Sequence, residues 1–241
     1  KRAFLVRDRF VTDFDRLDGD PLAYLAQAAL QREAEQIDMH RALPWPHKPV
    51  PGDTIWMGAA DAEGRVVSYI QSIYWEFGSG CVSKSTGFLM QNRGSSFALD
   101  PKALNPLEPG RRPFHTLNPA MAQLTDGRVF AYGTMGGEGQ PQTQAQLFER
   151  HVRHGMPLEE ALDAPRWLLG RTWGSSVTSL RFENRFDDSL LRELDRIGHQ
   201  TAVLDEAYSD TMGHAGGVTL HPDMSLSGAH DPRADGGAAG L

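Results

Sequence analysis

The segment from Pro44 to Asp53 constrains the fold of this chain most, because it separates two parts of different character. It reads Pro-Trp-Pro-His-Lys-Pro-Val-Pro-Gly-Asp, with four prolines within eight residues. Proline fixes φ and has no backbone N–H to donate, so we expect an exposed, irregular strap over these residues. An apolar strand is predicted directly after it, and that strand begins on a hydroxyl residue, Thr54.

Helices are predicted before the strap. Apolar residues recur at helical spacing from Phe4 to Leu17, which is typical of an amphipathic helix. Asp20-Pro21 has the form of an N-cap followed by proline at the first helical position, and one apolar face continues from Leu22 to Ile37.

Strands, then helices, then strands are predicted after the strap, which indicates an α+β layered fold rather than an alternating parallel one. A hairpin turns at Ala62-Glu63-Gly64, and a second one turns at Thr125-Asp126-Gly127. The predicted strands are Thr54–Ala60, Arg65–Ile73, Gly87–Asn92, Leu117–Leu124, Arg128–Thr134, Gly217–Leu220 and Ser225–Ala229, and the predicted helices are Pro141–His154, Pro157–Asp163 and Asp187–Ile197.

Composition excludes several classes of function. With 241 residues, 40% of them hydrophobic, the chain can form a sizeable core, and its net charge of −7 argues against nucleic acid or an anionic membrane as its partner. No apolar run approaches the ~18 residues of a membrane span. Cys81 is the only cysteine and no Cys/His spacing resembles a zinc site, so we expect neither a disulfide nor a metal.

The first residues, Lys1-Arg2-Ala3, open directly into a helical pattern without an initiator Met or a signal-like start. We therefore expect the chain to be part of a larger product. The cytoplasm is the default location, and the periplasm stays open if a signal was removed with the missing part.

Thr54 is the candidate nucleophile. A Thr hydroxyl needs a base within reach, and an N-terminal Thr carries one in its own α-amino group, whose pKa of about 7.7–8.0 suits neutral pH. Cleavage between Asp53 and Thr54 would create that base, and the same hydroxyl can perform the cut. The alternative is that Thr54 is only the first residue of a strand, as most such Thr residues are.

An acyl-transfer site also needs donors for the developing oxyanion. Gly136 and Gly137 end a predicted strand and precede a helix, so their N–H groups can point outward beside the positive helix end. A plain tight turn is the alternative interpretation. A phosphate loop is excluded because no Lys-Ser/Thr follows.

Two further residues could bind substrate. Arg93 lies in a polar loop and could hold a carboxylate by two parallel hydrogen bonds, although a surface arginine is the more common interpretation. His115 precedes Thr116 and could also contact substrate, and a loop or capping role is its alternative. A serine hydrolase is disfavoured because the chain has no Gly-x-Ser-x-Gly elbow.

Several segments together resemble the gamma-glutamyltransferase family of N-terminal nucleophile hydrolases. They include Asp53-Thr54, Phe77-Gly78-Ser79-Gly80, Glu108-Pro109-Gly110-Arg111-Arg112-Pro113, Gly136-Gly137, Asp163-Ala164-Pro165-Arg166 and Asp231-Pro232-Arg233-Ala234-Asp235-Gly236. The resemblance implies an αββα four-layer sandwich, made as a precursor that cleaves itself into two subunits. Residues 54–241 would be the small catalytic subunit, and residues 1–53 would be the C-terminal tail of the large subunit.

The resemblance also implies roles for single residues. Thr54 matches the family's nucleophile, and Gly136-Gly137 match its oxyanion hole. Ser72 stands where the family has a second Thr that hydrogen-bonds the nucleophile. Tyr74 stands where transpeptidases have an Asn that touches substrate. Where transpeptidases present Gln and Asp to the glutamyl group, this chain has Arg93 and Ser96, and His115-Thr116 replaces their Ser-Ser pair. The Asp that pairs with an α-ammonium group is thus absent and a cation is gained, which favours an anion without a nearby amine over a γ-glutamyl group.

Within the family the chain is most similar to the oxamate amidohydrolase branch, through Ile73-Tyr74-Trp75-Glu76-Phe77-Gly78, Gln91-Asn92-Arg93-Gly94 and the run from Tyr132 to Thr143. We expect an amidohydrolase that acts on a small carboxylate-bearing amide without a cofactor. A γ-glutamyltransferase, a cephalosporin-type acylase and an unprocessed relic without activity remain alternatives. The expected partners are the amide substrate and the large-subunit portion of the same precursor, and a homo-oligomer of processed heterodimers stays open.

Overall fold

The computed structural model describes residues 1–45, 53–170 and 178–240. The predicted strap falls mostly on residues 46–52, which lie outside the described residues. Its last residue, Asp53, is already part of the first strand, so that strand begins one residue earlier than predicted.

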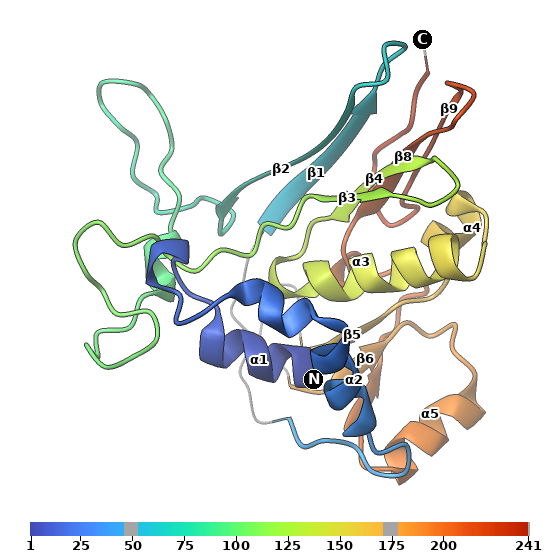
Figure 1. The fold of residues 1–241 in the computed structure, drawn as a ribbon, viewed down its shortest axis with the longest axis horizontal. Coiled ribbons are helices and arrows are strands. Elements are labelled where there is room, and N and C mark those ends of the chain that lie inside the picture. Colours follow the sequence, from blue (N-terminus) through green and yellow to red (C-terminus); the bar gives the residue numbers. More distant parts are fainter. Residues whose placement is uncertain (46–52, 171–177, 241) are drawn as a thin grey trace.

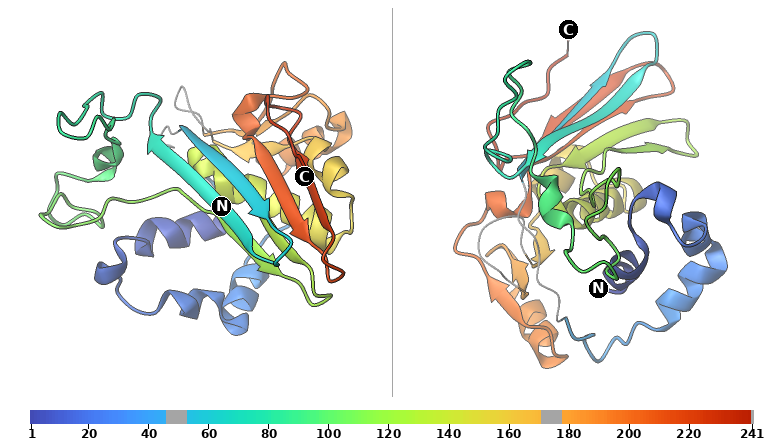
Figure 2. Two further views of the ribbon diagram at one scale, coloured as in Figure 1. Left: turned by 90° about the horizontal axis from the view of Figure 1, so that it is seen from above. Right: turned by 90° about the vertical axis from the view of Figure 1, so that its left-hand side faces the viewer.

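Two antiparallel sheets form the centre of the fold. Strands β1 (Asp53–Ala60) and β2 (Val66–Tyr74) make a hairpin, and β3 (Ala120–Gln123), β4 (Val129–Thr134), β8 (Ala215–Leu220) and β9 (Leu226–His230) make a sheet in the order β3-β4-β8-β9. β1 packs against β4 and β8, whereas α3 (Gln140–Phe148) and α4 (Leu158–Asp163) pack on the other face of the four-stranded sheet. Figures 1 and 2 show the hairpin, the sheet and these helices as successive layers. The α+β prediction and both predicted hairpins are confirmed.

A second, smaller sheet was not predicted from the sequence. It contains β5 (Trp167–Leu169), β6 (Leu180–Phe182) and β7 (Thr201–Val203), and α5 (Asp188–Arg196) connects β6 to β7. β5 pairs with β6 in antiparallel and β7 with β6 in parallel orientation. Strands of three residues are too short to show an alternating pattern, which is why periodicity did not reveal them.

The N-terminal segment is helical but more broken than predicted. α1 spans Arg2–Phe10 and α2 spans Gln27–Glu35. Asp20 caps the 3₁₀ helix Pro21–Leu25 as expected, since its carboxylate accepts the Leu22 N–H at 2.9 Å, but that helix ends before Ala26. The predicted strand Gly87–Asn92 is wrong, because those residues form only one isolated bridge, between Val82 and Leu89. No helix in the described ranges has the length and apolarity needed to cross a bilayer.

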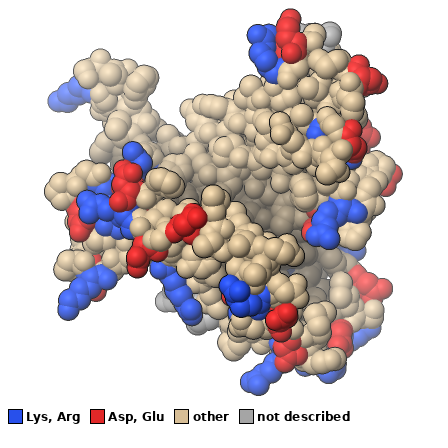
Figure 3. Space-filling model, viewed as in Figure 1, with Lys and Arg blue, Asp and Glu red and all other residues tan. Residues whose placement is uncertain are grey.

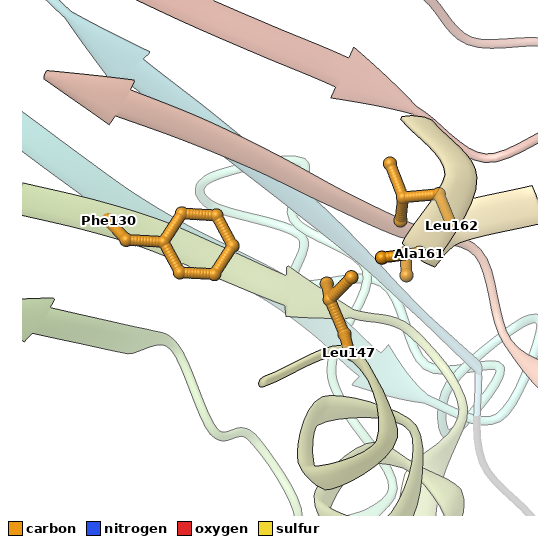
Figure 4. Close-up of a cluster of buried hydrophobic side chains, with 5 residues drawn as sticks. Phe130, Leu147, Ala161 and Leu162 are labelled. Carbon is orange, nitrogen blue, oxygen red and sulfur yellow. The ribbon is translucent and has the colours of Figure 1, made fainter. Parts of the chain in front are cut away.

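The hydrophobic core lies between the four-stranded sheet and the helices. Phe130 and Ala215 from the sheet meet Leu147, Ala161 and Leu162 from the helical layer, and all five are buried (Figure 4). The Phe130 ring also stacks on Tyr132 with 4.7 Å between the ring centroids. These contacts anchor β4, the strand that leads into Gly136 and Gly137.

The indole of Trp56 fixes the hairpin on the sheet. A Cβ atom on Gly133 would overlap the Cδ1 and Nε1 atoms of the indole, and a Cβ atom on Gly216 would lie 2.7 Å from Cζ3. The indole N–H donates to Ser68 Oγ at 2.9 Å, and the Ser68 hydroxyl lies 3.4 Å from the carbonyl oxygen of Tyr132. Two glycines on neighbouring strands therefore make room for one side chain of β1.

We expect Gly133→Ala to destabilise the fold by about 1–3 kcal/mol, because the new methyl group overpacks the contact with Trp56. Urea unfolding of the variant and of the wild type measures the difference. Gly94→Ala is the control, since a Cβ atom there meets no atom within 4 Å. Equal unfolding midpoints for the two variants would contradict the tight packing around Trp56.

Candidate active site

Thr54 lies at the open end of the β1–β2 hairpin, where the strand register is irregular. Asp53 pairs with Tyr74 and Ile55 pairs with Gln71, so Ser72 and Ile73 both lie opposite Thr54. Such a β-bulge bends a strand and redirects its side chains. The structure thus brings Thr54 and Ser72, two of the predicted site residues, to neighbouring positions on paired strands.

Tyr74 closes this end of the hairpin in an unusual backbone conformation. Its φ is 82°, its side chain is buried, and its N–H donates to Ser72 Oγ at 2.8 Å. A positive φ costs a non-glycine residue of this size about 1–3 kcal/mol, and such strained residues are enriched at functional sites. The conformation places the aromatic ring against Arg93.

Arg93 is buried, so the interpretation of it as a surface arginine is wrong. Only 1% of the residue is exposed, and its guanidinium carbon lies 4.8 Å from the centroid of the Tyr74 ring. Nη1 donates to Thr116 Oγ1 at 3.2 Å, whereas Nε and Nη2 have no hydrogen-bond partner among the described residues. Burial lowers the pKa of the guanidinium, an effect that Tyr74 opposes. Because an unpaired buried charge is costly, this arginine fits a site that receives an anion.

The other predicted binding residues lie around Arg93 in different ways. Ser96 is turned back to its own loop, because its hydroxyl donates to the Arg93 carbonyl oxygen at 2.8 Å. His115 accepts the Leu117 N–H on Nδ1 at 3.3 Å, which leaves Nε2 to carry the proton of the neutral ring. Desolvation by neighbouring atoms, and then the positive charge of Arg93, lower the pKa of His115, so the ring is neutral at pH 7.

Gly136 and Gly137 follow β4 and precede α3, as predicted. Their φ values are 120° and 50°, both in the region that favours glycine, and both residues are buried. The Gly139 N–H closes the turn on the Gly136 carbonyl oxygen at 2.7 Å. The tight-turn interpretation is therefore correct as geometry.

Asn118 and Gln140 connect the Arg93 pocket to this turn, and the sequence did not single them out. Asn118 Nδ2 donates to the Thr116 carbonyl oxygen at 2.7 Å, and the Asn118 N–H donates to Oε1 of Gln140, a buried residue, at 3.1 Å. Gln144 Nε2 also reaches the Asn118 carbonyl oxygen at 2.5 Å. Pairing between loop and helix residues more than 20 positions apart leaves no periodic signal in a sequence. Trp56 was missed for the same reason.

Four buried charges support the strand beside the glycine turn. Arg166 Nη1 lies 2.6 Å from Asp231 Oδ2. Arg233 contacts both carboxylates, with Nη1 3.0 Å from Asp231 Oδ1 and Nη2 2.6 Å from Glu183 Oε2. Asp231 also accepts the Ala215 N–H at 2.7 Å, which holds the start of β8 next to the end of β4. Burial alone would raise the pKa of Asp231, but Arg166 and Arg233 hold it below its ordinary value.

A cavity of about 560 Å³ lies away from these residues. It is enclosed by α1, α3, α5 and the small sheet, with Phe4, Trp167 and Phe182 in its wall, and none of the predicted site residues lines it. Figure 3 shows charged side chains around the rim of one face and a hollow at its centre.

Comparison with known proteins places the chain in one family. The family model described as gamma-glutamyltranspeptidase matches residues 1–241. The chain is 54% identical over 240 residues to the oxamate amidohydrolase proenzyme of Klebsiella pneumoniae, covering 100% of this chain and 45% of that protein. It is 42% identical to the glutathione hydrolase-like YwrD proenzyme of Bacillus subtilis, covering 100% of this chain and 46% of the relative.

Solved structures agree on the fold. The chain superposes on a cephalosporin acylase from Bacillus halodurans with a TM-score of 0.77 and 30% identity, covering 97% of this chain and 42% of the acylase. The chain thus spans about half the length of the curated relatives it matches. This agreement confirms the N-terminal nucleophile hydrolase type of fold.

We expect Asp231→Asn to lower the free energy of unfolding by about 3–5 kcal/mol at pH 7, because it leaves buried arginines without full compensation. Arg65→Ala is the control, since its ion pair with Asp61 is exposed and such pairs contribute little to stability. The lowered pKa of Asp231 fixes the sign of the pH dependence. Its contribution is complete above the unfolded pKa of about 3.9 and is lost as the pH falls through the lower folded value. Urea unfolding between pH 7 and pH 2.5 should show the free energies of unfolding of the wild type and of Asp231→Asn approaching each other as the pH falls. A difference that stays constant over this range would contradict the role of the Asp231 charge in this network.

Proposed function

The chain belongs to the gamma-glutamyltranspeptidase family, and on that premise we propose that it is the nucleophile-bearing part of a self-processing amidohydrolase. In this proposal the precursor is cut between Asp53 and Thr54. The new N-terminal threonine then hydrolyses a small amide that carries a carboxylate, such as oxamate, through an acyl-Thr54 intermediate.

The observation that carries the choice of substrate is the Arg93 guanidinium. It is buried, held by Thr116 and the Tyr74 ring, and two of its nitrogen atoms have no partner among the described residues. Carboxylates bind arginine through two parallel hydrogen bonds, and such a fork needs two free N–H directions. The loop that carries Arg93 is fixed to the end of β2, since the Asn92 N–H donates to the Ile73 carbonyl oxygen at 3.2 Å. That fixation puts the cation near the strand end where Thr54 lies.

Oxamate is a short substrate whose two functional groups are adjacent. In oxamate the carboxylate carbon is bonded directly to the amide carbon. When the carboxylate binds Arg93, the amide carbon that the nucleophile attacks is therefore only one bond away from the bound group. His115, neutral at pH 7, adds a hydrogen-bond donor beside Arg93 without adding a second charge.

The proposed mechanism has two halves. Thr54 Oγ attacks the amide carbon while its own α-amine takes the hydroxyl proton, and the Gly136 and Gly137 N–H groups stabilise the oxyanion. The amine passes that proton to the departing nitrogen, and ammonia leaves. Water then attacks the ester with the same amine as base, and the dicarboxylate is released. No cofactor takes part in this proposal.

Two alternatives use the same nucleophile. The 30% identity to a cephalosporin acylase keeps a larger acyl group open, and γ-glutamyl transfer is open through the glutathione hydrolase-like relative. Both need room for a larger acyl group beyond a carboxylate bound to Arg93, whereas oxamate needs none. An unprocessed relic without activity is the third possibility.

We expect Thr54→Ala to abolish cleavage between Asp53 and Thr54, because the hydroxyl that attacks the Asp53 carbonyl is lost. Intact-mass spectrometry of the precursor over time gives the result. The wild-type precursor should yield a fragment that begins at Thr54. Ser96→Ala is the control, since the Ser96 hydroxyl is already bonded within its own loop. A fully active wild-type sample with an uncut bond would refute the mechanism.

We expect Arg93→Met to raise KM for oxamate by about 10–100-fold, the equivalent of a hydrogen bond to a charged group worth ~1.5–3 kcal/mol. For oxamide, in which an amide replaces the carboxylate, KM should change less than about threefold. Arg93→Lys keeps the charge but not the fork, so we expect an intermediate value. Steady-state kinetics on both substrates decide the matter, and equal losses on oxamate and oxamide would rule out carboxylate recognition by Arg93.

A further inference from the structure

Arg7 of α1 contacts two segments of the candidate site at once. Its Nη1 atom lies 3.6 Å from Glu138 Oε2, and Glu138 directly follows Gly136-Gly137. Its guanidinium carbon lies 5.8 Å from the centroid of the Phe114 ring, and Phe114 directly precedes His115. Arg7 thus lies at the junction of the oxyanion turn and the loop that surrounds Arg93.

The contact is held in place from several sides. The Phe4 ring, one turn earlier on α1, lies 4.4 Å below the Arg7 guanidinium, and Nε donates to Asp8 Oδ1 at 2.7 Å. Only 20% of the Arg7 side chain and 16% of the Glu138 side chain are exposed. Charges shielded from water in this way interact more strongly than a pair on an open surface.

The chain that follows α1 is tied to the same loop. Arg111 Nη2 donates to Thr12 Oγ1 at 2.8 Å, and the Arg112 N–H donates to Asp13 Oδ2 at 3.0 Å. Asp13 itself is buried. Residues 1–13 therefore pack on the 111–114 loop through a set of specific bonds, and the position of Arg7 does not depend on one ion pair.

Glu138 needs compensation because of where it lies. Its carboxylate belongs to the residue next to Gly137, whose N–H is a proposed oxyanion donor. A negative charge there would oppose the negative charge that develops on the substrate oxygen, and it would do so only in the transition state. The Arg7 guanidinium, 3.6 Å from that carboxylate, offsets part of its field.

We propose that Arg7 is a positioning residue of the active site, acting through Glu138 on the oxyanion turn. This role rests on the proposed function, because it requires that Gly136 and Gly137 stabilise an oxyanion. It also gives residues 1–13 a part in the reaction. Since Arg7 precedes the bond between Asp53 and Thr54, its segment must stay bound to the nucleophile-bearing segment after cleavage.

The test is a double-mutant cycle on the processed enzyme with oxamate as substrate. We expect Arg7→Met to lower kcat at least about tenfold while KM changes less than about twofold, because the missing compensation acts on the transition state. Glu138→Gln alone should change kcat less than about threefold. In the Arg7→Met, Glu138→Gln protein kcat should recover at least about fivefold over Arg7→Met, because the negative charge that Arg7 offsets is gone as well.

Two variants separate this role from simple damage to the fold. Arg7→Lys keeps a positive charge and should stay within about threefold of the wild-type kcat. Arg9→Met makes the same chemical change at an exposed position of the same helix, and should leave kcat and KM as they are. If the melting temperatures of all variants equal that of the wild type, the changes in kcat do not come from damage to the fold.

The possible outcomes are distinct. An active wild type with an unchanged Arg7→Met variant would overturn the role of Arg7 alone. So would a double variant no better than Arg7→Met, because the loss would then be structural. A wild type that turns over neither oxamate nor any other amide would overturn the proposed function, and this role with it.

Discussion

The packing of Trp56 between two sheets is the constraint on which the rest of the site depends. The residue belongs to β1, two positions after Thr54, and its indole fills the space that Gly133 and Gly216 leave on β4 and β8. β4 runs on to Gly136 and Gly137 only a few residues later. The nucleophile and oxyanion positions proposed here come from two different sheets, so their relative placement is only as exact as the contact that joins those sheets.

The buried arginines of this molecule differ in how far the described residues compensate their charges. Arg166 and Arg233 are surrounded by two carboxylates and by carbonyl oxygens, so their charges are compensated and they connect β8 to the helical layer. Arg93 is equally buried but has only a hydroxyl and an aromatic ring as described partners. The described residues offset the desolvation cost of the first two arginines, but they do not offset that of Arg93 to the same degree. That contrast supports a binding role for Arg93 better than its position in a polar loop does.

Sequence reasoning succeeded where structure is local. The two hairpins were predicted because alternating strands flank short turns, and the capping role of Asp20 because a side chain two residues away bonds the backbone. It failed where the determinant is not local. β5, β6 and β7 are three residues each and gain their stability from pairing with distant strands, while Gly87–Asn92 has a strand-like pattern but makes only one bridge.

The sequence by itself determined the family, the two hairpins and which residue types are available for the chemistry, because motifs and turn signals are written in consecutive residues. Only the tertiary structure decided that Arg93 is buried under Tyr74, that Asn118 and Gln140 link its loop to the glycine turn, and that Arg7 reaches Glu138 from a helix more than a hundred residues away. Burial and charge compensation depend on every atom within a few ångströms, whichever part of the chain supplies it. A linear pattern carries no record of those neighbours.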